Sequence, residues 1–137
     1  MNVGERERVT QNRVVKLFKD KLGYTYLGDF HDRDNSNIEV EYLTRYLKKA
    51  GYSSAIIKKT INEFVSLAGN QQLNLYDLNK GVYSALRYGM KLRENPGESP
   101  ITVMLIDWKA AENNNFYIAE EVTVKSNNSS VLILYYM

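Results

Sequence analysis

The sequence predicts an α+β fold in which four helices come first and a mixed β-sheet follows. Up to Gly89, apolar residues recur at intervals of about three and four, which is the spacing of amphipathic helices. After Pro100 they alternate with polar residues or form short continuous runs, which is typical of strands. Helical and strand patterns are therefore separated along the chain, which favours an α+β class over alternating parallel units.

Length and composition suit one globular domain. We expect it to cover residues 1–137, with a helical part at 5–89 and a sheet part at 90–137. The chain has no cysteine, which excludes disulfides, thiolate zinc sites and thiol catalysis and suits a reducing cytoplasm. No apolar stretch approaches the ~18 residues of a membrane span. The net charge of +2 permits nucleic-acid binding without arguing for it.

Four segments show the helical spacing, at residues 5–22, 37–50, 54–68 and 75–88. Three of them end at a glycine, namely Gly23, Gly51 and Gly89. Glycine adopts the left-handed conformation that closes a helix C-terminus, so these positions predict the ends of the helices. Ser53 or Ser54 is a suitable N-cap for the third helix, because its hydroxyl can accept a hydrogen bond from the first turn.

The second part of the chain predicts strands. Residues 90–93 form a short extended piece, and a loop with two prolines follows it. Three longer strands are expected at residues 101–107, 116–124 and 131–137. The middle one alternates apolar and polar residues. The other two are nearly continuous apolar runs, as expected for strands covered on both faces.

Two groups of acidic residues could suggest a metal site. In FHDRDNSN, Asp32 and Asp34 start like a calcium loop, but Leu43 stands where the bidentate glutamate is required. A polar turn, with Ser36 or Asn37 capping the next helix, explains this stretch better.

The second group lies near the strands. Asp107 with Glu120 or Glu121 could hold a divalent cation for phosphodiester hydrolysis. Nucleases of this type carry a glutamate two residues before a lysine, and here Thr123 follows Glu121 at that distance. Charges on the exposed face of a strand are therefore the better interpretation.

Local chemistry identifies no catalytic centre. The alternating acids and arginines at the start of the first helix fit the helix dipole. The chain has no phosphate-binding glycine loop and a single histidine, which nearly excludes an ATP site and the usual nucleophile–base pairs.

The ordered set of motifs is more informative. ERVTQNRVVKLFKDKLGYTYLGD, NSNIEVEYLTRYLKKAGYS, LNKGVYSALRYGMKL and VMLIDWKAAENNNFYIAEEVTVK together resemble the N-terminus of the R (restriction) subunit of type I restriction–modification enzymes. The resemblance runs from about Gly4 to Lys125. It implies a restriction-endonuclease-like core joined to an ATP-driven DNA translocase. The complete subunit would cut DNA with Mg²⁺ in a complex with methylation and specificity subunits.

The resemblance also implies site residues. In the family, the metal-binding residues look like an Asp in an Arg-Pro-Asp element and a Glu-x-Lys on the next strand, often assisted by a Glu on the first helix. Glu7 matches that helical position, and Gln11 lies beside it one turn later. Asn115 stands where the family usually has Asp, and neither Arg-Pro-Asp nor Glu-x-Lys occurs in this sequence.

The terminal SSVLILYYM suggests why these elements are absent. Several DNA sequences can encode VLILYYM followed by a stop codon. When a C is placed before one of these sequences and the reading frame is moved one base earlier, it encodes Arg-Pro-Asp-Ile-Val-Leu-Tyr-Val, which is the expected family element. We therefore expect a one-base slip between the codons of Lys125 and Ser130, which would truncate the sheet. The chain would then be an inactive fragment whose open last strand promotes self-association.

Two alternatives stay open from the sequence. The chain could be a free-standing α+β module that binds DNA or a protein through its first helix and basic loops. It could also be an intact Mg²⁺ nuclease that uses Asp107 and Glu120 or Glu121.

Overall fold

The computed structural model describes residues 3–33, 38–124 and 130–136, of which 123–124 and 130–136 are described by their backbone alone. Four helices and small mixed sheets confirm the α+β class. Contacts divide the chain into two compact units. The sheet unit comprises Met1–Asn37 and Asn115–Met137, and the helical unit comprises Ile38–Asn114. Along the sequence, the helical unit thus separates the two segments of the sheet unit.

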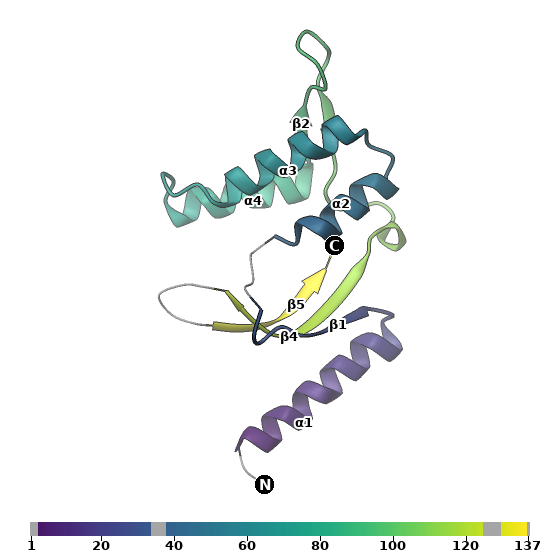
Figure 1. Ribbon diagram of the computed structural model, residues 1–137, viewed down its shortest axis with the longest axis vertical. Coiled ribbons are helices and arrows are strands. Elements are labelled where there is room, and N and C mark those ends of the chain that lie inside the picture. Colours follow the sequence, from purple (N-terminus) through teal and green to yellow (C-terminus); the bar gives the residue numbers. More distant parts are fainter. Residues whose placement is uncertain (1–2, 34–37, 125–129, 137) are drawn as a thin grey trace. The chain divides into compact units, whose positions relative to one another are not determined.

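The sheet unit combines one long helix with a three-stranded mixed sheet (Figure 1). Helix α1 (Val3–Lys16) continues into a π-helical turn, η1 (Leu17–Lys21). Strand β1 (Thr25–Asp29) pairs in parallel with β4 (Phe116–Val124). On its other side, β4 pairs antiparallel with β5 (Ser130–Tyr136). The strand order β1-β4-β5 leaves β1 and β5 at the edges of the described sheet.

The sequence prediction differs from the sheet unit in two ways. The helix expected at residues 5–22 changes to π-helical geometry after Lys16, and its apolar stripe is poorly covered, with Leu17 and Leu22 50% and 55% exposed. Strand β1 was not predicted. Its five residues, TYLGD, show no clean alternation, and it becomes a strand by pairing with β4.

A bulge shapes the middle of β4. The β4–β5 register shifts between Ile118 and Val122, and Glu121 has a φ of +54°. Between the pairs Ile118–Leu134 and Val122–Leu132, β4 has three residues and β5 has one. The extra residues bend β4 locally and re-aim the side chains beside them. Ala119 and Val122, which precede and follow the two glutamates, pack with Phe30 in the small core of the sheet unit. Glu120 and Glu121 are not part of this apolar core.

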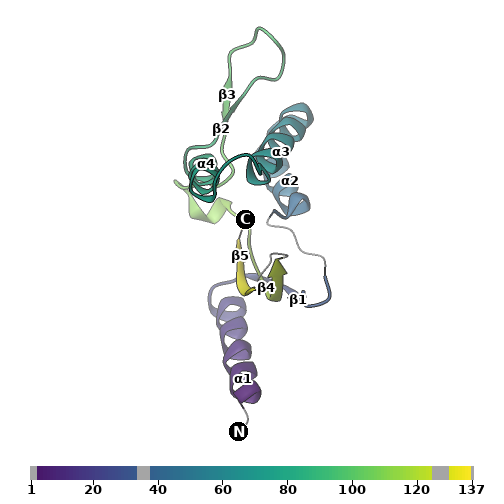
Figure 2. The same ribbon diagram turned by 90° about the vertical axis from the view of Figure 1, so that its left-hand side faces the viewer.

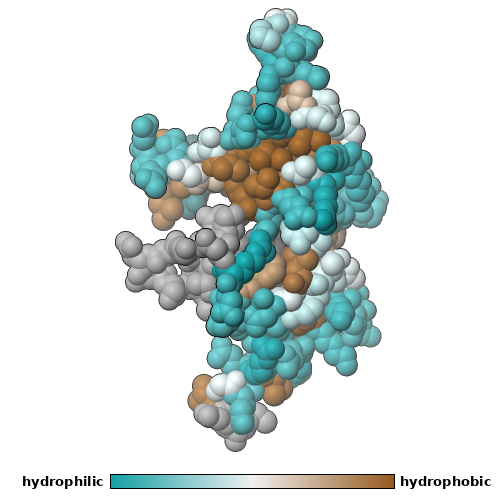
Figure 3. Space-filling view, viewed as in Figure 1, coloured by the Kyte–Doolittle hydropathy of each residue, from teal (hydrophilic) through white to brown (hydrophobic). Residues whose placement is uncertain are grey.

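The helical unit packs three helices with a short hairpin (Figures 1 and 2). Its helices are α2 (Val40–Lys49), α3 (Ser54–Ala68) and α4 (Leu75–Tyr88). The hairpin pairs β2 (Met90–Leu92) with β3 (Ile101–Val103), and a 3₁₀ turn, η2 (Ala111–Asn113), follows. Apolar side chains gather over α3, whereas polar ones cover the hairpin tip (Figure 3).

Local signals set the ends of these helices. The predicted bounds of α3 and α4, 54–68 and 75–88, are confirmed. Ser53 caps α3, because its hydroxyl accepts a hydrogen bond from the Ile56 amide at 3.2 Å. Gly51 and Gly89 adopt positive φ angles of 95° and 81° after α2 and α4, as expected of helix-ending glycines.

Two expectations for the helical unit were wrong in their extent. The strand expected at 101–107 ends at Val103, and Leu105 and Ile106 are buried in a loop instead. Its first residue, Ile101, is 43% exposed, so the strand is not covered on both faces. Helix α2 begins at Val40 rather than residue 37. The caps proposed at residues 36 and 37 lie outside the described residues.

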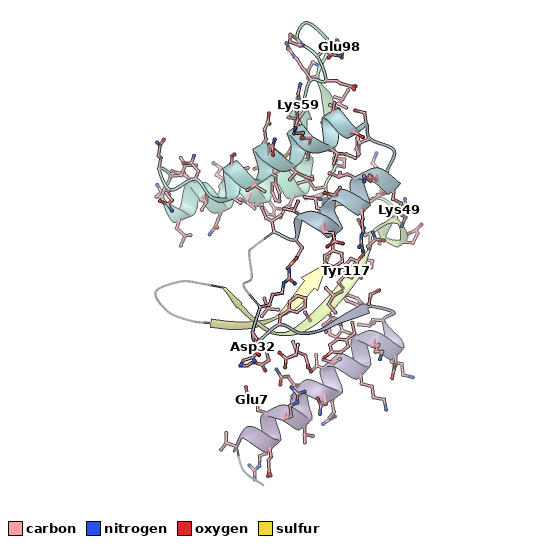
Figure 4. The ribbon with its side chains drawn as sticks, viewed as in Figure 1. Glu7, Asp32, Lys49, Lys59, Glu98 and Tyr117 are labelled. Carbon is pink, nitrogen blue, oxygen red and sulfur yellow. The ribbon has the colours of Figure 1, made fainter. Side chains whose placement is uncertain are left out.

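Hydrogen bonds from Ser53 and Lys59 connect the hairpin to α3; the Ser53 hydroxyl donates to Glu94 Oε1 at 3.1 Å. The Lys59 ammonium donates hydrogen bonds to the backbone carbonyls of Arg93 and Glu94, at 2.9 and 2.6 Å (Figure 4).

Across the described residues, no helix has both the length and the apolar character that crossing a bilayer demands.

Candidate functional site

The buried polar side chains of the sheet unit gather where α1 lies against β1 and β4. Gln11 is the only buried residue of α1, with 6% of its surface exposed. Glu120 on β4 is 2% exposed. Burying a charged or amide group is costly unless it is hydrogen-bonded or paired, so each of these side chains needs a partner. The partners come from α1, β1 and β4.

Glu120 is held by two residues. The Tyr26 hydroxyl donates a hydrogen bond to Glu120 Oε2 at 2.8 Å, and Arg8 Nη2 lies 3.6 Å from the same oxygen. Desolvation, followed by the hydrogen bond to Glu120, raises the pKa of Tyr26 above its ordinary value. The phenol therefore stays protonated as a donor. The Arg8 side chain is half exposed, so it links the buried carboxylate to solvent.

Glu121 is held by the helix. The Gln11 side-chain amide donates a hydrogen bond to Glu121 Oε1. In a regular strand, consecutive side chains point to opposite faces. Here the bulge at Glu121 lets both Glu120 and Glu121 contact side chains of α1. The bulge thus places two adjacent carboxylates at one helix.

Glu7 and Gln11, the two site residues expected from the sequence, lie one turn apart on α1. Gln11 is buried against β4, whereas Glu7 is exposed. Figure 4 shows Glu7 on α1. Within the described part of the chain, no hydrogen bond or ion pair of Glu7 is found. Its carboxylate is therefore available to a ligand.

A small cavity of about 270 Å³ opens beside this cluster. Its walls include Tyr26 and Glu120 together with three cations, Arg8, Lys16 and Lys19. Asp20 is the second acid in its lining. The cavity is thus polar and carries more basic than acidic side chains.

The cluster does not by itself fit a divalent metal ion. Such an ion needs carboxylate oxygens that are free to coordinate it. One oxygen of Glu120 is already shared by Arg8 and Tyr26, and the Arg8 guanidinium occupies a position where it would repel a cation. In the ranges that the structure describes, no three acidic or histidine side chains converge as a metal site would require.

The other acidic groups singled out in the sequence are engaged in turns. His31 donates its backbone N–H to Asp29 Oδ1 at 2.8 Å, and its Nδ1 lies 3.1 Å from Asp32 Oδ1. Asp107 belongs to the helical unit, where it accepts hydrogen bonds from Lys109 N, Ala110 N and Asn113 Nδ2. These bonds, led by the one from Asn113, lower the pKa of Asp107. Residues 34 and 125 lie outside the described residues.

The sequence interpretation missed three members of the cluster. Glu120 was expected on an exposed strand face and is buried instead. Arg8 was explained by helix electrostatics, and Tyr26 had no assigned role. The signal that could have pointed to them is the consecutive pair Glu120–Glu121 in an otherwise alternating strand, because such a pair disrupts the alternation where a bulge can form.

Comparison with known proteins identifies the family. The model of the type I restriction enzyme R protein N terminus matches residues 4–131, nearly the whole chain. Neither the curated proteins nor the solved structures give a significant match. The match confirms the resemblance carried by the ordered motifs. The chain belongs to the family of type I restriction enzyme R protein N termini.

Proposed function

We propose that this chain forms the first part of the nuclease domain of a type I restriction R subunit. The observation that carries the proposal is the family match over residues 4–131. In the complete subunit, this domain would act on DNA in the cytoplasm, together with methylation and specificity subunits and with Mg²⁺ and ATP. The attachment of α1 to the bulge of β4 through Gln11–Glu121 and Arg8–Glu120 would hold the first helix of that domain against its sheet.

Within that subunit, Glu7 is proposed as an accessory acid of the cation site, and Gln11 as the residue that positions it. Gln11 anchors α1 to β4, and Glu7 lies on the same side of the helix, one turn away. Because Glu7 is exposed, its carboxylate can contact a bound cation, whereas Glu120 and Glu121 are already held by other side chains. Bound Mg²⁺ would supply charge neutralisation and an activated water.

We further propose that these 137 residues do not cut DNA by themselves. Their sequence contains neither Arg-Pro-Asp nor Glu-x-Lys, and the glutamates on β4 are held by Arg8, Tyr26 and Gln11. Supercoiled plasmid incubated with the purified chain and Mg²⁺ should stay uncut. Nicking that disappears in Asp107→Ala would instead establish the intact-nuclease alternative.

A graft separates the role of Glu7 from that of the remaining subunit. Residues 1–124 of this chain would replace the matching segment in an R subunit of an active system. We expect Glu7→Gln to lower DNA cleavage about tenfold or more, while ATP hydrolysis stays unchanged, because an accessory acid acts on cleavage alone. Glu5→Gln, on the same helix, is the matched control. Equal cleavage by the two variants would remove Glu7 from the site.

A second candidate function is a DNA- or protein-binding module. The basic cavity beside Arg8, Lys16 and Lys19 favours it. DNA binding of this kind should weaken steeply with salt, because phosphate contacts release counterions. A salt-sensitive shift of duplex DNA by the isolated chain, lost in Lys16→Ala/Lys19→Ala, would support this function. No shift at low salt would exclude DNA binding by the isolated chain.

A further inference from the structure

Another cavity lies entirely within the helical unit. Its volume is about 830 Å³, within the roughly 300–1,000 Å³ range of small-molecule sites. It is bounded by the end of α2, the end of α4 and the loop that follows β3. None of its lining residues belongs to the sheet unit, so it is separate from the cluster around Glu120.

Three cations line this cavity: Lys49, Arg87 and Lys109. All three are exposed, and each comes from a different element of the helical unit. Figure 4 shows Lys49 at the end of α2, where its ammonium lies 3.4 Å from the Asn113 carbonyl oxygen. The lining therefore carries more basic than acidic side chains.

The single acid of the lining does not cancel this charge pattern. Asp107 Oδ1 accepts hydrogen bonds from Lys109 N and Ala110 N, at 3.0 and 2.9 Å. Asp107 Oδ2 accepts one from Asn113 Nδ2 at 2.9 Å. The carboxylate is thus used to shape the loop. The loop in turn places Trp108 and Lys109 at the cavity.

Aromatic side chains form the other part of the wall. Tyr46, Tyr52 and Trp108 all line the cavity. Trp108 is fixed in position, since its indole N–H donates to the Leu86 carbonyl at 2.9 Å and the Arg87 guanidinium lies 5.1 Å from its ring centroid. Nevertheless, the indole is 51% exposed. An ordered aromatic ring with an open surface is suited to stacking.

We propose that this cavity binds a nucleotide, with the base stacked on the aromatic wall around Trp108 and the phosphate held by Lys49, Arg87 and Lys109. Planar bases stack on aromatic side chains, and phosphates are bound by lysine and arginine. An acidic peptide would use the cations but not the aromatic wall. The nucleotide can be a free molecule or one unit of a single DNA strand. This inference does not depend on the proposed nuclease role.

The chain reports on its own binding, because Trp108 is its only tryptophan. The full chain would be titrated with dAMP, with single-stranded oligo(dT) of about 20 nucleotides, and with inorganic phosphate, while Trp108 fluorescence is recorded. We expect saturable quenching by dAMP or the oligonucleotide. Saturation by dAMP points to a free nucleotide as ligand, whereas saturation by oligo(dT) alone points to a DNA strand.

Variants test whether the site is the cavity. Anisotropy of a labelled oligonucleotide or nucleotide would be measured for Lys109→Ala and Arg87→Ala, and we expect affinity to fall about tenfold. Lys58→Ala removes the same charge from an exposed position outside the cavity and should change affinity less than about twofold. Circular dichroism confirms that each variant is folded; Lys109→Ala suffices if Arg87→Ala unfolds.

Three results would overturn the proposal. The first is no quenching by either nucleotide probe. The second is inorganic phosphate binding as tightly as the nucleotide, because the aromatic wall would then contribute nothing. The third is an equal loss of affinity in Lys58→Ala, which would indicate nonspecific attraction to the basic surface. None of these results bears on whether the grafted R subunit cuts DNA.

Discussion

Gln11 on α1 and Glu121 on β4 are joined by a side-chain hydrogen bond across 110 positions of the sequence. This bond, with the Arg8–Glu120 contact, holds a helix that buries none of its apolar side chains fully. The attachment of α1 to the sheet therefore depends on polar contacts more than on hydrophobic packing.

Gln11→Ala should detach α1 from the sheet. The change removes a hydrogen bond to a charged group, and we expect the free energy of unfolding to fall by about 1.5–3 kcal/mol. Urea unfolding followed by circular dichroism measures this loss. Asn12→Ala, on the exposed side of the same helix, should cost less than about 0.5 kcal/mol. Equal effects of the two changes would show that the Gln11–Glu121 bond contributes nothing.

Tyr26→Phe should destabilise the sheet unit by about 1 kcal/mol, because Glu120 loses a donor. The substitution should also alter how the free energy of unfolding depends on pH. The folded state raises the pKa of Tyr26, so its contribution is present below the unfolded pKa of about 10 and is lost as pH rises through the higher folded value.

The alkaline loss of stability should therefore be smaller in Tyr26→Phe than in the wild type. Thermal melts between neutral and strongly alkaline pH measure it. Tyr83→Phe, at a 61% exposed position on α4, is the control and should keep the wild-type profile. A Tyr26→Phe profile parallel to that of the wild type would contradict the prediction.

Gly89→Ala should be strongly destabilising. Gly89 has a φ of 81°, and an added Cβ would lie 2.7 Å from the Val103 carbonyl oxygen. Backbone strain and the close contact together should cost more than about 2 kcal/mol. Gly97→Ala isolates the strain, because φ is 88° there and no atom lies within 4 Å of the added Cβ. It should cost only about 1–2 kcal/mol; a larger effect at Gly97 would refute the steric argument.

Asp107→Asn should make the free energy of unfolding depend less on pH in the acid range. The hydrogen bonds from Asn113, Ala110 and Lys109 lower the pKa of Asp107, so its contribution is present above the unfolded pKa of about 3.9 and is lost as pH falls through the lower folded value. Fluorescence of the adjacent Trp108 follows this transition. Asp20→Asn should leave the acid profile unchanged, and a matching effect there would indicate general charge repulsion.

Strand β5 should mediate self-association. It lies at an edge of the described three-stranded sheet, and unpaired strand edges bind other strands. Light scattering over a range of concentrations should show dimers or larger species as concentration rises. A monodisperse monomer at the highest concentration would exclude this role for β5.

Local patterns accounted for much of the helical unit. The period of apolar residues and the caps at Ser53 and Gly89 depend on contacts within a few residues, so they can be read directly from the sequence. The strand expected at 101–107 failed for the opposite reason. Asp107 and Asn114 bind the backbone of the loop after Val103, and this alternative to strand pairing has no periodic signal.

By itself, the sequence determined the helix periods, the strand at 116–124 and the family. Only the tertiary structure decided where the carboxylates of that strand point. Glu121 adopts a positive φ in a bulge, and the burial of Glu120 requires Arg8 and Tyr26 from elements about a hundred positions away. A short-range pattern cannot encode such contacts, because they form only after the helix and the strands pack together.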